Sequence, residues 1–149
     1  MTLARLCRSL TALAAAALLL PACEASPAAP AANAPYSQTD LRVGAGISAA
    51  TGNVLTVHYT GWIYDATKTD NKGLQFDTSV GTDPFTFTLG AGNVIAGWEQ
   101  GLVGMKVGGL RKLIVPPSLG YGGLRRGPLP PNTAMVFEVE LIEVKEADQ

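Results

Sequence analysis

Residues Thr133–Lys145, with the sequence TAMVFEVELIEVK, carry the clearest strand pattern in the chain. Apolar side chains stand at every second position, and Glu138 and Glu140 stand between them. A strand with one face in a core and the other in water has this period of two. The stretch therefore predicts a long strand whose buried face carries Met135, Phe137, Val139 and Leu141.

Weaker versions of this alternation lie upstream, and they predict the other strands of a sheet. These segments are Asn53–Thr60, Pro84–Leu89 and Gly109–Val115, with Asp40–Val43 as a candidate edge strand. Gly and Pro mark loops, and two stretches are predicted to be loops: Asp65–Gly73 and Gly120–Asn132.

One helix is predicted between the strands, at Val94–Gln100. Apolar residues recur there at helical spacing, Asn93 is the expected N-cap and Gly101 the expected stop. A sheet that buries one face on a single helix is the simplest arrangement of these elements. The expected fold class is therefore α+β.

The N-terminus has the pattern of an export signal. Arg5 and Arg8 precede the uncharged run Ser9–Ala22, which is too short for a confident membrane span. We therefore expect residues 1–22 to be a signal peptide, residues 23–39 a flexible Ala/Pro-rich tether, and residues 40–149 the folded domain.

The apolar run leads into Leu20-Pro21-Ala22-Cys23, which resembles a bacterial lipobox with Cys23 as the first mature residue, although Pro21 stands where Ala, Ser or Thr is usual. The resemblance implies that Cys23 is lipidated and anchors the chain in the periplasm or cell envelope. The alternative is ordinary signal cleavage nearby, which leaves Cys23 as an unpaired thiol.

Most chemical motifs are absent from the predicted domain. It holds one histidine and no cysteine, so it has neither a Cys/His zinc site nor a Cys–His nucleophile. His58 is expected to be a hydrogen-bonded structural residue, and Gly90-Ala91-Gly92 a turn rather than a nucleotide loop. A net charge of −1 provides no basic footprint for nucleic acid. We expect no cofactor and no metal.

Aromatic residues are the unusual feature of the domain. Core filling explains any single one, but the set exceeds what a small sheet around one helix can hold, and an apolar aromatic cleft is the usual form of a site for a small ligand or peptide. The set is Tyr59, Trp62, Tyr64, Phe76, Phe85, Phe87, Trp98, Tyr121 and Phe137.

Seven short blocks resemble the FKBP-type prolyl isomerases, in the order of that family and across about Asp40 to Val144. The resemblance implies an antiparallel half-barrel of five or six strands wrapped around the short helix. The blocks are Val57–Gly61 (VHYTG), Phe76–Ser79 (FDTS), Pro84–Gly90 (PFTFTLG), Val94–Gly101 (VIAGWEQG), Gly120–Gly122 (GYG), Pro130–Thr133 (PPNT) and Met135–Leu141 (MVFEVEL).

The resemblance also implies a proline site between helix and sheet. Trp98 would be its floor, and the Tyr121 hydroxyl and the Ile95 N–H would donate to substrate carbonyls. Asp77 would orient the site rather than act as an acid or base. The implied catalytic set is Tyr59, Asp77, Ile95, Trp98, Tyr121 and Phe137, and the implied substrate-binding set is Phe76, Phe85, Val94 and Leu129.

The expected activity is peptidyl-prolyl cis-trans isomerisation of X–Pro segments in exported proteins, with macrolides of the FK506/rapamycin type as inhibitors. The alternative is a non-catalytic, chaperone-like module that binds Pro-containing segments. A monomer is expected, because only a short tether precedes the domain.

Three departures from the family pattern bear on the site. The segment Trp62–Gln75 is longer than usual, so that Asp65–Gly73 is expected to bulge from the sheet. The Val80–Asp83 loop lacks an Arg beside Asp77, and Arg125 and Arg126 follow Tyr121.

Overall fold

Two long strands, β2 (Val54–Tyr64) and β6 (Met135–Lys145), form the centre of the sheet. They pair antiparallel from Val54 opposite Lys145 to Ile63 opposite Met135. The computed structural model describes residues 34–146. The predicted signal peptide, Cys23 and the tether up to residue 33 lie outside this range.

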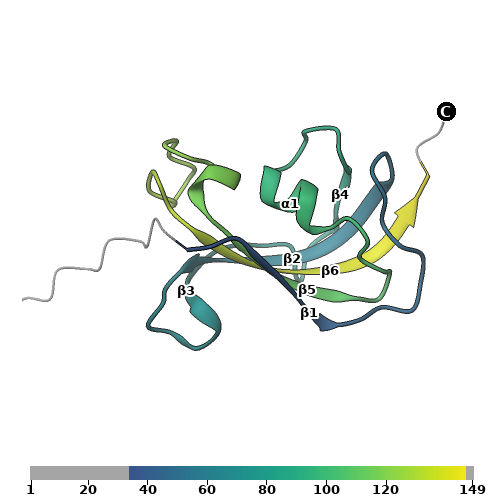
Figure 1. Ribbon diagram of the computed structural model, residues 1–149, viewed down its shortest axis with the longest axis horizontal. Coiled ribbons are helices and arrows are strands. Elements are labelled where there is room, and N and C mark those ends of the chain that lie inside the picture. Colours follow the sequence, from purple (N-terminus) through teal and green to yellow (C-terminus); the bar gives the residue numbers. More distant parts are fainter. Residues whose placement is uncertain (1–33, 147–149) are drawn as a thin grey trace, which may run out of the picture.

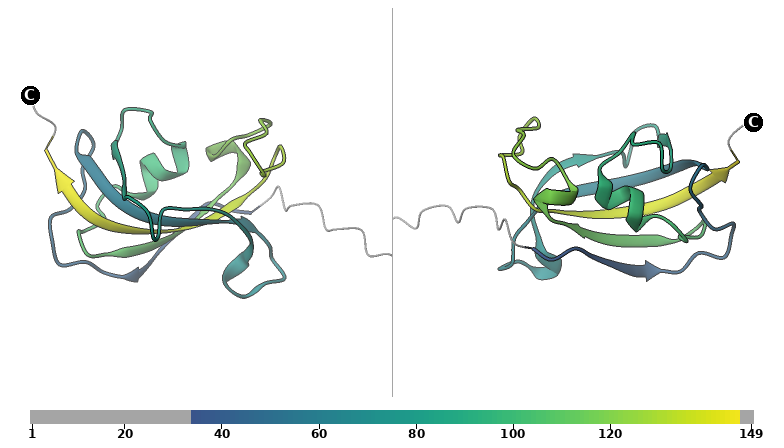
Figure 2. Two further views of the ribbon diagram at one scale, coloured as in Figure 1. Left: turned by 180° about the vertical axis from the view of Figure 1, so that it is seen from behind. Right: turned by 45° about the horizontal axis from the view of Figure 1, so that its top comes forward.

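Four shorter strands complete a six-stranded antiparallel sheet of order β1-β5-β6-β2-β3, with β4 paired to β2. They are β1 (Ser37–Arg42), β3 (Lys72–Thr78), β4 (Phe85–Thr88) and β5 (Leu110–Val115). The sheet curves around the helix α1 (Ala96–Gly101), which lies on its concave side (Figures 1 and 2). The predicted α+β half-barrel is confirmed.

The core fills the space between α1 and the concave face. Trp98 of the helix and Leu102, its C-cap, lie in this core and meet buried side chains of four strands: Leu55, Val57, Phe87, Leu113, Val115, Phe137, Val139 and Leu141. The predicted inward face of the last strand is buried as expected, and Val136 is buried as well. Among residues 34–146 no helix has the length and apolar character needed to cross a membrane.

The helix begins later than its sequence pattern predicts. Val94 and Ile95 precede it, and Ile95, in extended conformation, is the N-cap, without a side-chain hydrogen bond. A helix residue stabilises the preceding turn instead, because the Glu99 carboxylate accepts hydrogen bonds from the backbone N–H groups of Gly90 and Gly92. Asn93 therefore does not serve as the N-cap.

The folded part begins before Asp40. Strand β1 starts at Ser37, which pairs with Ile114, so Ser37–Thr39 belong to the sheet rather than to the predicted tether. The reason is Tyr36, the first large side chain after the Ala/Pro-rich segment. It packs against the core and donates its hydroxyl hydrogen to the Gly97 carbonyl at 3.1 Å.

Strand β3 has no counterpart among the strands predicted from alternation. It is an edge strand, mostly exposed or half-buried, and its pairing with β2 shifts register twice between Gly61 and Tyr64. Such a strand does not show a period of two. The predicted loop Asp65–Gly73 contains the short 3-10 helix η1 (Thr69–Asn71) and the first residues of β3.

This inserted segment folds onto the convex side of the sheet, away from α1 (Figure 1). Lys72 Nζ lies 2.5 Å from Glu138 Oε1 and 4.5 Å from the centre of the Trp62 ring. Asp70 forms a longer ion pair with Lys112, at 3.4 Å. The insertion is thus tied to the outer face of the sheet.

Candidate functional site

A cavity of about 140 Å³ opens between α1 and the concave face of the sheet. Every strand around it except β1 and β5 contributes a side chain, as do the loops on either side. Its lining residues are Tyr59, Phe76, Asp77, Phe85, Asn93, Val94, Ile95, Trp98, Tyr121 and Phe137.

Trp98 forms the floor, with 4% of its surface exposed. Three rings stand close to perpendicular to its indole: Tyr59 at 5.2 Å and 80°, Phe137 at 5.4 Å and 87°, and Phe85 at 6.4 Å and 72° between centroids and planes. Edge-to-face contacts of this kind are favourable, and they fix the rings relative to one another. The result is a rigid apolar pocket assembled from β2, β4, α1 and β6.

Gly61 in β2 makes room for the far side of the pocket. A Cβ atom at this position would lie 2.7 Å from Phe76 Cζ and 2.9 Å from Phe137 Cε1, closer than side-chain carbons approach. The missing side chain lets Phe76 and Phe137 meet edge to face, with centroids 5.7 Å apart. This explains the glycine at the end of the VHYTG block.

The polar edge of the cavity is a hydrogen-bonded pair. Tyr59 donates its hydroxyl hydrogen to Asp77 Oδ2 at 2.7 Å, and the backbone N–H of Thr78 donates to Oδ1 at 2.9 Å. The pKa of Tyr59 is raised well above its ordinary value, mainly because the side chain is partly buried and secondly because it donates a hydrogen bond to Asp77. Tyr59 is therefore a neutral donor near pH 7, and it holds Asp77 in the absence of an Arg in the Val80–Asp83 loop.

Two donors at the mouth remain for a bound peptide. The backbone N–H of Ile95 has no hydrogen-bond partner among residues 34–146, and the Tyr121 side chain lines the cavity. The Arg126 guanidinium lies 5.3 Å from the centre of the Tyr121 ring, at the rim of the site. Arg125 is exposed beside it.

Two residues of the site were not predicted to be part of it. Asn93 lines the cavity, and Glu99 holds the Gly90–Gly92 turn that leads into it. The sequence signal for Glu99 is the pattern Gly90-Ala91-Gly92, because glycines permit the positive φ, here 86° and 74°, of a turn that presents N–H groups to a nearby carboxylate.

Nine of the ten residues predicted for the pocket line the cavity, and Leu129 does not. Leu129 is only 3% exposed and belongs to the core, because mutual backbone hydrogen bonds with Arg126 turn its side chain inward. Cys23 lies outside the described residues. His58 is a structural residue as predicted, with Nδ1 3.2 Å from Ser79 Oγ.

The described residues contain no group of three or more His, Cys, Asp or Glu side chains that could hold a metal ion. The polar groups at the cavity, namely a carboxylate already engaged by two donors, a neutral phenol and a backbone N–H, suit the orientation of a peptide. They do not form a nucleophile–base pair.

Comparison with known proteins gives consistent matches. Residues 46–142, more than half of the chain, match the family of FKBP-type peptidyl-prolyl cis-trans isomerases. An FK506-binding protein of Neisseria meningitidis serogroup A is 47% identical over 109 residues, which are 72% of this chain and 94% of the relative. FK506-binding protein 1 of Aspergillus oryzae is 41% identical over 105 residues, 68% of this chain and 90% of the relative.

A solved structure is also similar. The crystal structure of FkpA from Escherichia coli superposes with a TM-score of 0.63 at 36% sequence identity. The superposition covers 76% of this chain and 49% of the FkpA chain, so the similarity concerns about half of that protein.

Proposed function

Because the chain belongs to the family of FKBP-type peptidyl-prolyl cis-trans isomerases, it catalyses rotation about X–Pro peptide bonds, and we propose that the cavity above Trp98 is where this reaction takes place. The observation that carries the proposal is the set of three rings standing at 72–87° to the buried indole. A prolyl ring is apolar and compact, and it suits such a pocket.

The chemistry follows from the electronic structure of the amide. Resonance gives the C–N bond partial double-bond character and a barrier of about 20 kcal/mol, so an X–Pro bond isomerises in tens to hundreds of seconds unaided. The planar amide separates charge, and water stabilises that separation. The twisted transition state has lost it, so a dry apolar pocket binds the twisted form better than the planar one.

Each side chain then has a role in the differential binding. Trp98 supports the prolyl ring, and Tyr59, Phe85 and Phe137 exclude water around it. The Ile95 N–H and the Tyr121 hydroxyl hold substrate carbonyls and so orient the bond that rotates. Each ~1.4 kcal/mol by which these contacts favour the transition state gives a tenfold rate increase. Asp77, engaged by Tyr59, orients the site.

The test of the site is a pair of tryptophan variants. Trp98→Leu removes the floor and should lower kcat/KM on a Leu-Pro or Phe-Pro tetrapeptide by at least about tenfold. The matched control is Trp62→Leu, since Trp62 lies on the convex side against Lys72. Equal activity of Trp98→Leu and the control would reject the assignment. A wild-type protein that binds the peptide without accelerating isomerisation would favour the non-catalytic binding module.

The proposal extends to FK506- and rapamycin-type macrolides, which we expect to bind the same cavity. Its support is the match to proteins named for FK506 binding. In a Trp62→Phe background Trp98 is the only tryptophan, so its fluorescence should respond to FK506, and the midpoint should coincide with loss of isomerase activity. A fluorescence response without inhibition would place the macrolide elsewhere.

The proposal also assigns the protein to the periplasm or cell envelope, as a monomer that assists the folding of exported proteins. The support is the charged start, the apolar run Ser9–Ala22 and the lipobox-like Leu20–Cys23. A mass spectrum of the protein from membranes should show an N-terminal Cys23 carrying lipid, and Cys23→Ser should release it. An unmodified N-terminus beyond Cys23 would exclude the anchor. Sedimentation of the purified protein should show the mass of a monomer.

A further inference from the structure

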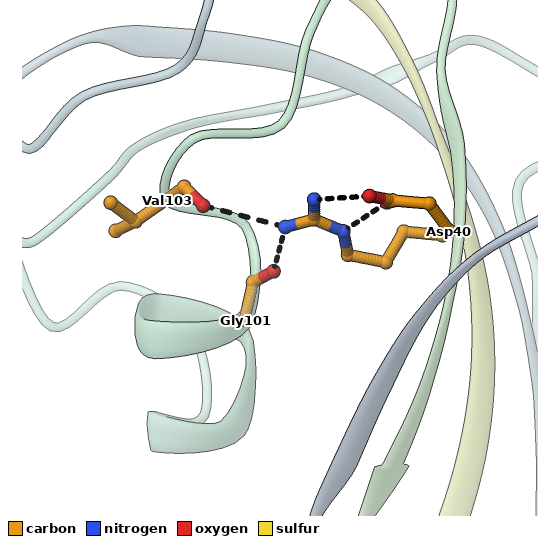
Figure 3. A network of polar contacts seen from close by, with 4 residues as sticks. Asp40, Gly101 and Val103 are labelled. Atoms are coloured by element: carbon orange, nitrogen blue, oxygen red, sulfur yellow. Dashed lines mark hydrogen bonds and ion pairs between the residues drawn. The ribbon is translucent and has the colours of Figure 1, made fainter. Parts of the chain in front are cut away.

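A buried arginine joins the N-terminal strand to the end of the pocket helix. Arg111 projects from β5 into the concave side, where it is 8% exposed. Its Nε and Nη2 bind the two carboxylate oxygens of Asp40 at 2.5 and 3.0 Å. Its Nη1 donates to the carbonyls of Gly101, the last residue of α1, at 2.8 Å and of Val103 at 3.3 Å (Figure 3).

The helix needs such external support. It has six residues, no side-chain N-cap and glycines at positions 97 and 101. Helices this short are unstable in isolation, and each interior Gly weakens a helix by about 1 kcal/mol relative to Ala. The position of α1 must therefore be set by tertiary contacts rather than by its own backbone.

Strand β1 and the residue before it supply two of these contacts. Asp40 acts through Arg111 on the Gly101 carbonyl, and Tyr36 donates directly to the Gly97 carbonyl at 3.1 Å. The two contacts, together called the grip, hold the helix by the Gly97 carbonyl near its start and the Gly101 carbonyl at its end. Both Tyr36 and Asp40 precede residue 46, where the match to the family begins, so these contacts lie partly outside the matched segment.

Trp98 lies between the two gripped carbonyls, directly after Gly97. A shift of the helix would therefore move the indole relative to Tyr59 and Phe137, which belong to the sheet. We propose that Asp40 and Arg111 are positioning residues for the isomerase reaction, which hold α1 against β5 and so keep the Trp98 floor at its distance from the walls. The inference rests on the assignment of the reaction to this cavity.

A purely structural ion pair would give a different result. It would raise the free energy of unfolding while leaving the folded pocket unchanged, so that variants would melt earlier yet keep wild-type kinetics once folded. A positioning pair changes the pocket in the folded protein. The decisive readouts are therefore KM and kcat far below the melting temperature, and the exposure of Trp98 to a quencher.

The chain provides a matched control on the same strand. Arg42 pairs with Glu140 and donates to the Gly108 carbonyl, but it does not contact α1. Its side chain is 53% exposed and that of Glu140 is 41% exposed. Substitution of this more exposed pair removes an ion pair of β1 while leaving the contacts of Tyr36 and Arg111 with the helix intact.

The experiment compares Asp40→Asn, Arg111→Lys, Arg111→Met and the control Arg42→Met, all in the Trp62→Phe background, after each is shown to be folded. We expect Arg111→Met to lower kcat/KM by about tenfold, mainly through KM, and to increase acrylamide quenching of Trp98. The kcat/KM and the quenching of Arg111→Lys should fall between those of the background protein and Arg111→Met, because a lysine ammonium lacks the planar guanidinium that binds Asp40 and Gly101 at the same time. Arg42→Met should match the background protein.

Each outcome bears on the inference. A double variant, Asp40→Asn with Arg111→Met, should be no worse than Arg111→Met alone, because both changes break one chain of contacts. Where Arg111→Met does not fold, Asp40→Asn and Tyr36→Phe provide the same comparison. Folded variants with background KM, kcat and quenching would overturn the inference. An inactive background protein would instead reject the catalytic assignment of the cavity.

Discussion

Gly97 sets how closely the pocket helix approaches the sheet, and replacing it is the most direct test of the site. A Cβ atom at this position would lie 2.7 Å from Val115 Cγ1 and 2.9 Å from Cγ2. Favourable carbon–carbon contacts begin at about 3.5 Å. In Gly97→Ala, residue 97 of the helix and the Val115 side chain must therefore separate by roughly 3.5 − 2.7 = 0.8 Å.

Two opposing terms determine the stability of this variant. Replacing Gly by Ala in a helix gains about 1 kcal/mol, and overpacking a dense core costs about 1–3 kcal/mol. The free energy of unfolding should thus fall by only about 0–2 kcal/mol. The rate should suffer more, because Trp98 is the next residue and a displacement near 1 Å can reduce a rate by up to about 100-fold.

The assay is kcat/KM on a Leu-Pro tetrapeptide, measured alongside urea unfolding. Val115→Ala provides the control, since it removes both Cγ atoms that the new methyl group would meet. Gly97→Ala combined with Val115→Ala should recover to within about threefold of Val115→Ala alone, a clear departure from additivity. Wild-type kcat/KM in Gly97→Ala, or a double variant that multiplies the two losses, would refute the reasoning.

Three further changes have defined outcomes. Tyr59→Phe removes the donor to Asp77 and should lower both kcat/KM and, by about 1 kcal/mol, the free energy of unfolding. Because the folded pKa of Tyr59 is raised, the stability it contributes is present below the unfolded pKa of about 10 and is lost as the pH rises above it. Urea unfolding at pH 8 and above pH 10 should thus show a smaller decrease for Tyr59→Phe than for wild type. Lys72→Met breaks the contact of the insertion with Glu138 and should reduce stability by up to about 1 kcal/mol with unchanged kcat/KM, so a lower kcat/KM would link the insertion to catalysis. Phe137→Ala, at a side chain only 4% exposed, should destabilise the fold by about 3–5 kcal/mol in calorimetry and urea unfolding, and a smaller loss would mean that the core collapses around the gap.

The sequence alone predicts those parts of the fold that depend on local periodicity. The alternation in Thr133–Lys145 identifies β6 and its buried face, because a strand with one wet and one dry face repeats every two residues. The helix and three further strands follow in the same way, with shifted ends. Edge strand β3 does not, since two register shifts and a mostly exposed surface remove its period.

The pocket was predictable for a different reason. Its residue types and their order in short blocks resemble a known family, and nine of the ten predicted residues surround one cavity. Leu129 is the exception. Whether a side chain in a Gly- and Pro-rich loop faces a cavity or the core depends on how the loop closes, and here its backbone pairing with Arg126 turns Leu129 inward.

The sequence by itself thus determined the secondary structure with strong periodicity, the family and the chemistry of an apolar pocket without a nucleophile. Only the tertiary structure decided that Tyr36 and Ser37–Thr39 belong to the folded part and that Arg111 joins Asp40, 71 residues away, to the end of α1. The physical reason is the separation along the chain over which each kind of interaction acts. Periodicity reports which face of a segment is dry, whereas a hydrogen bond between distant residues depends on where the whole sheet places them.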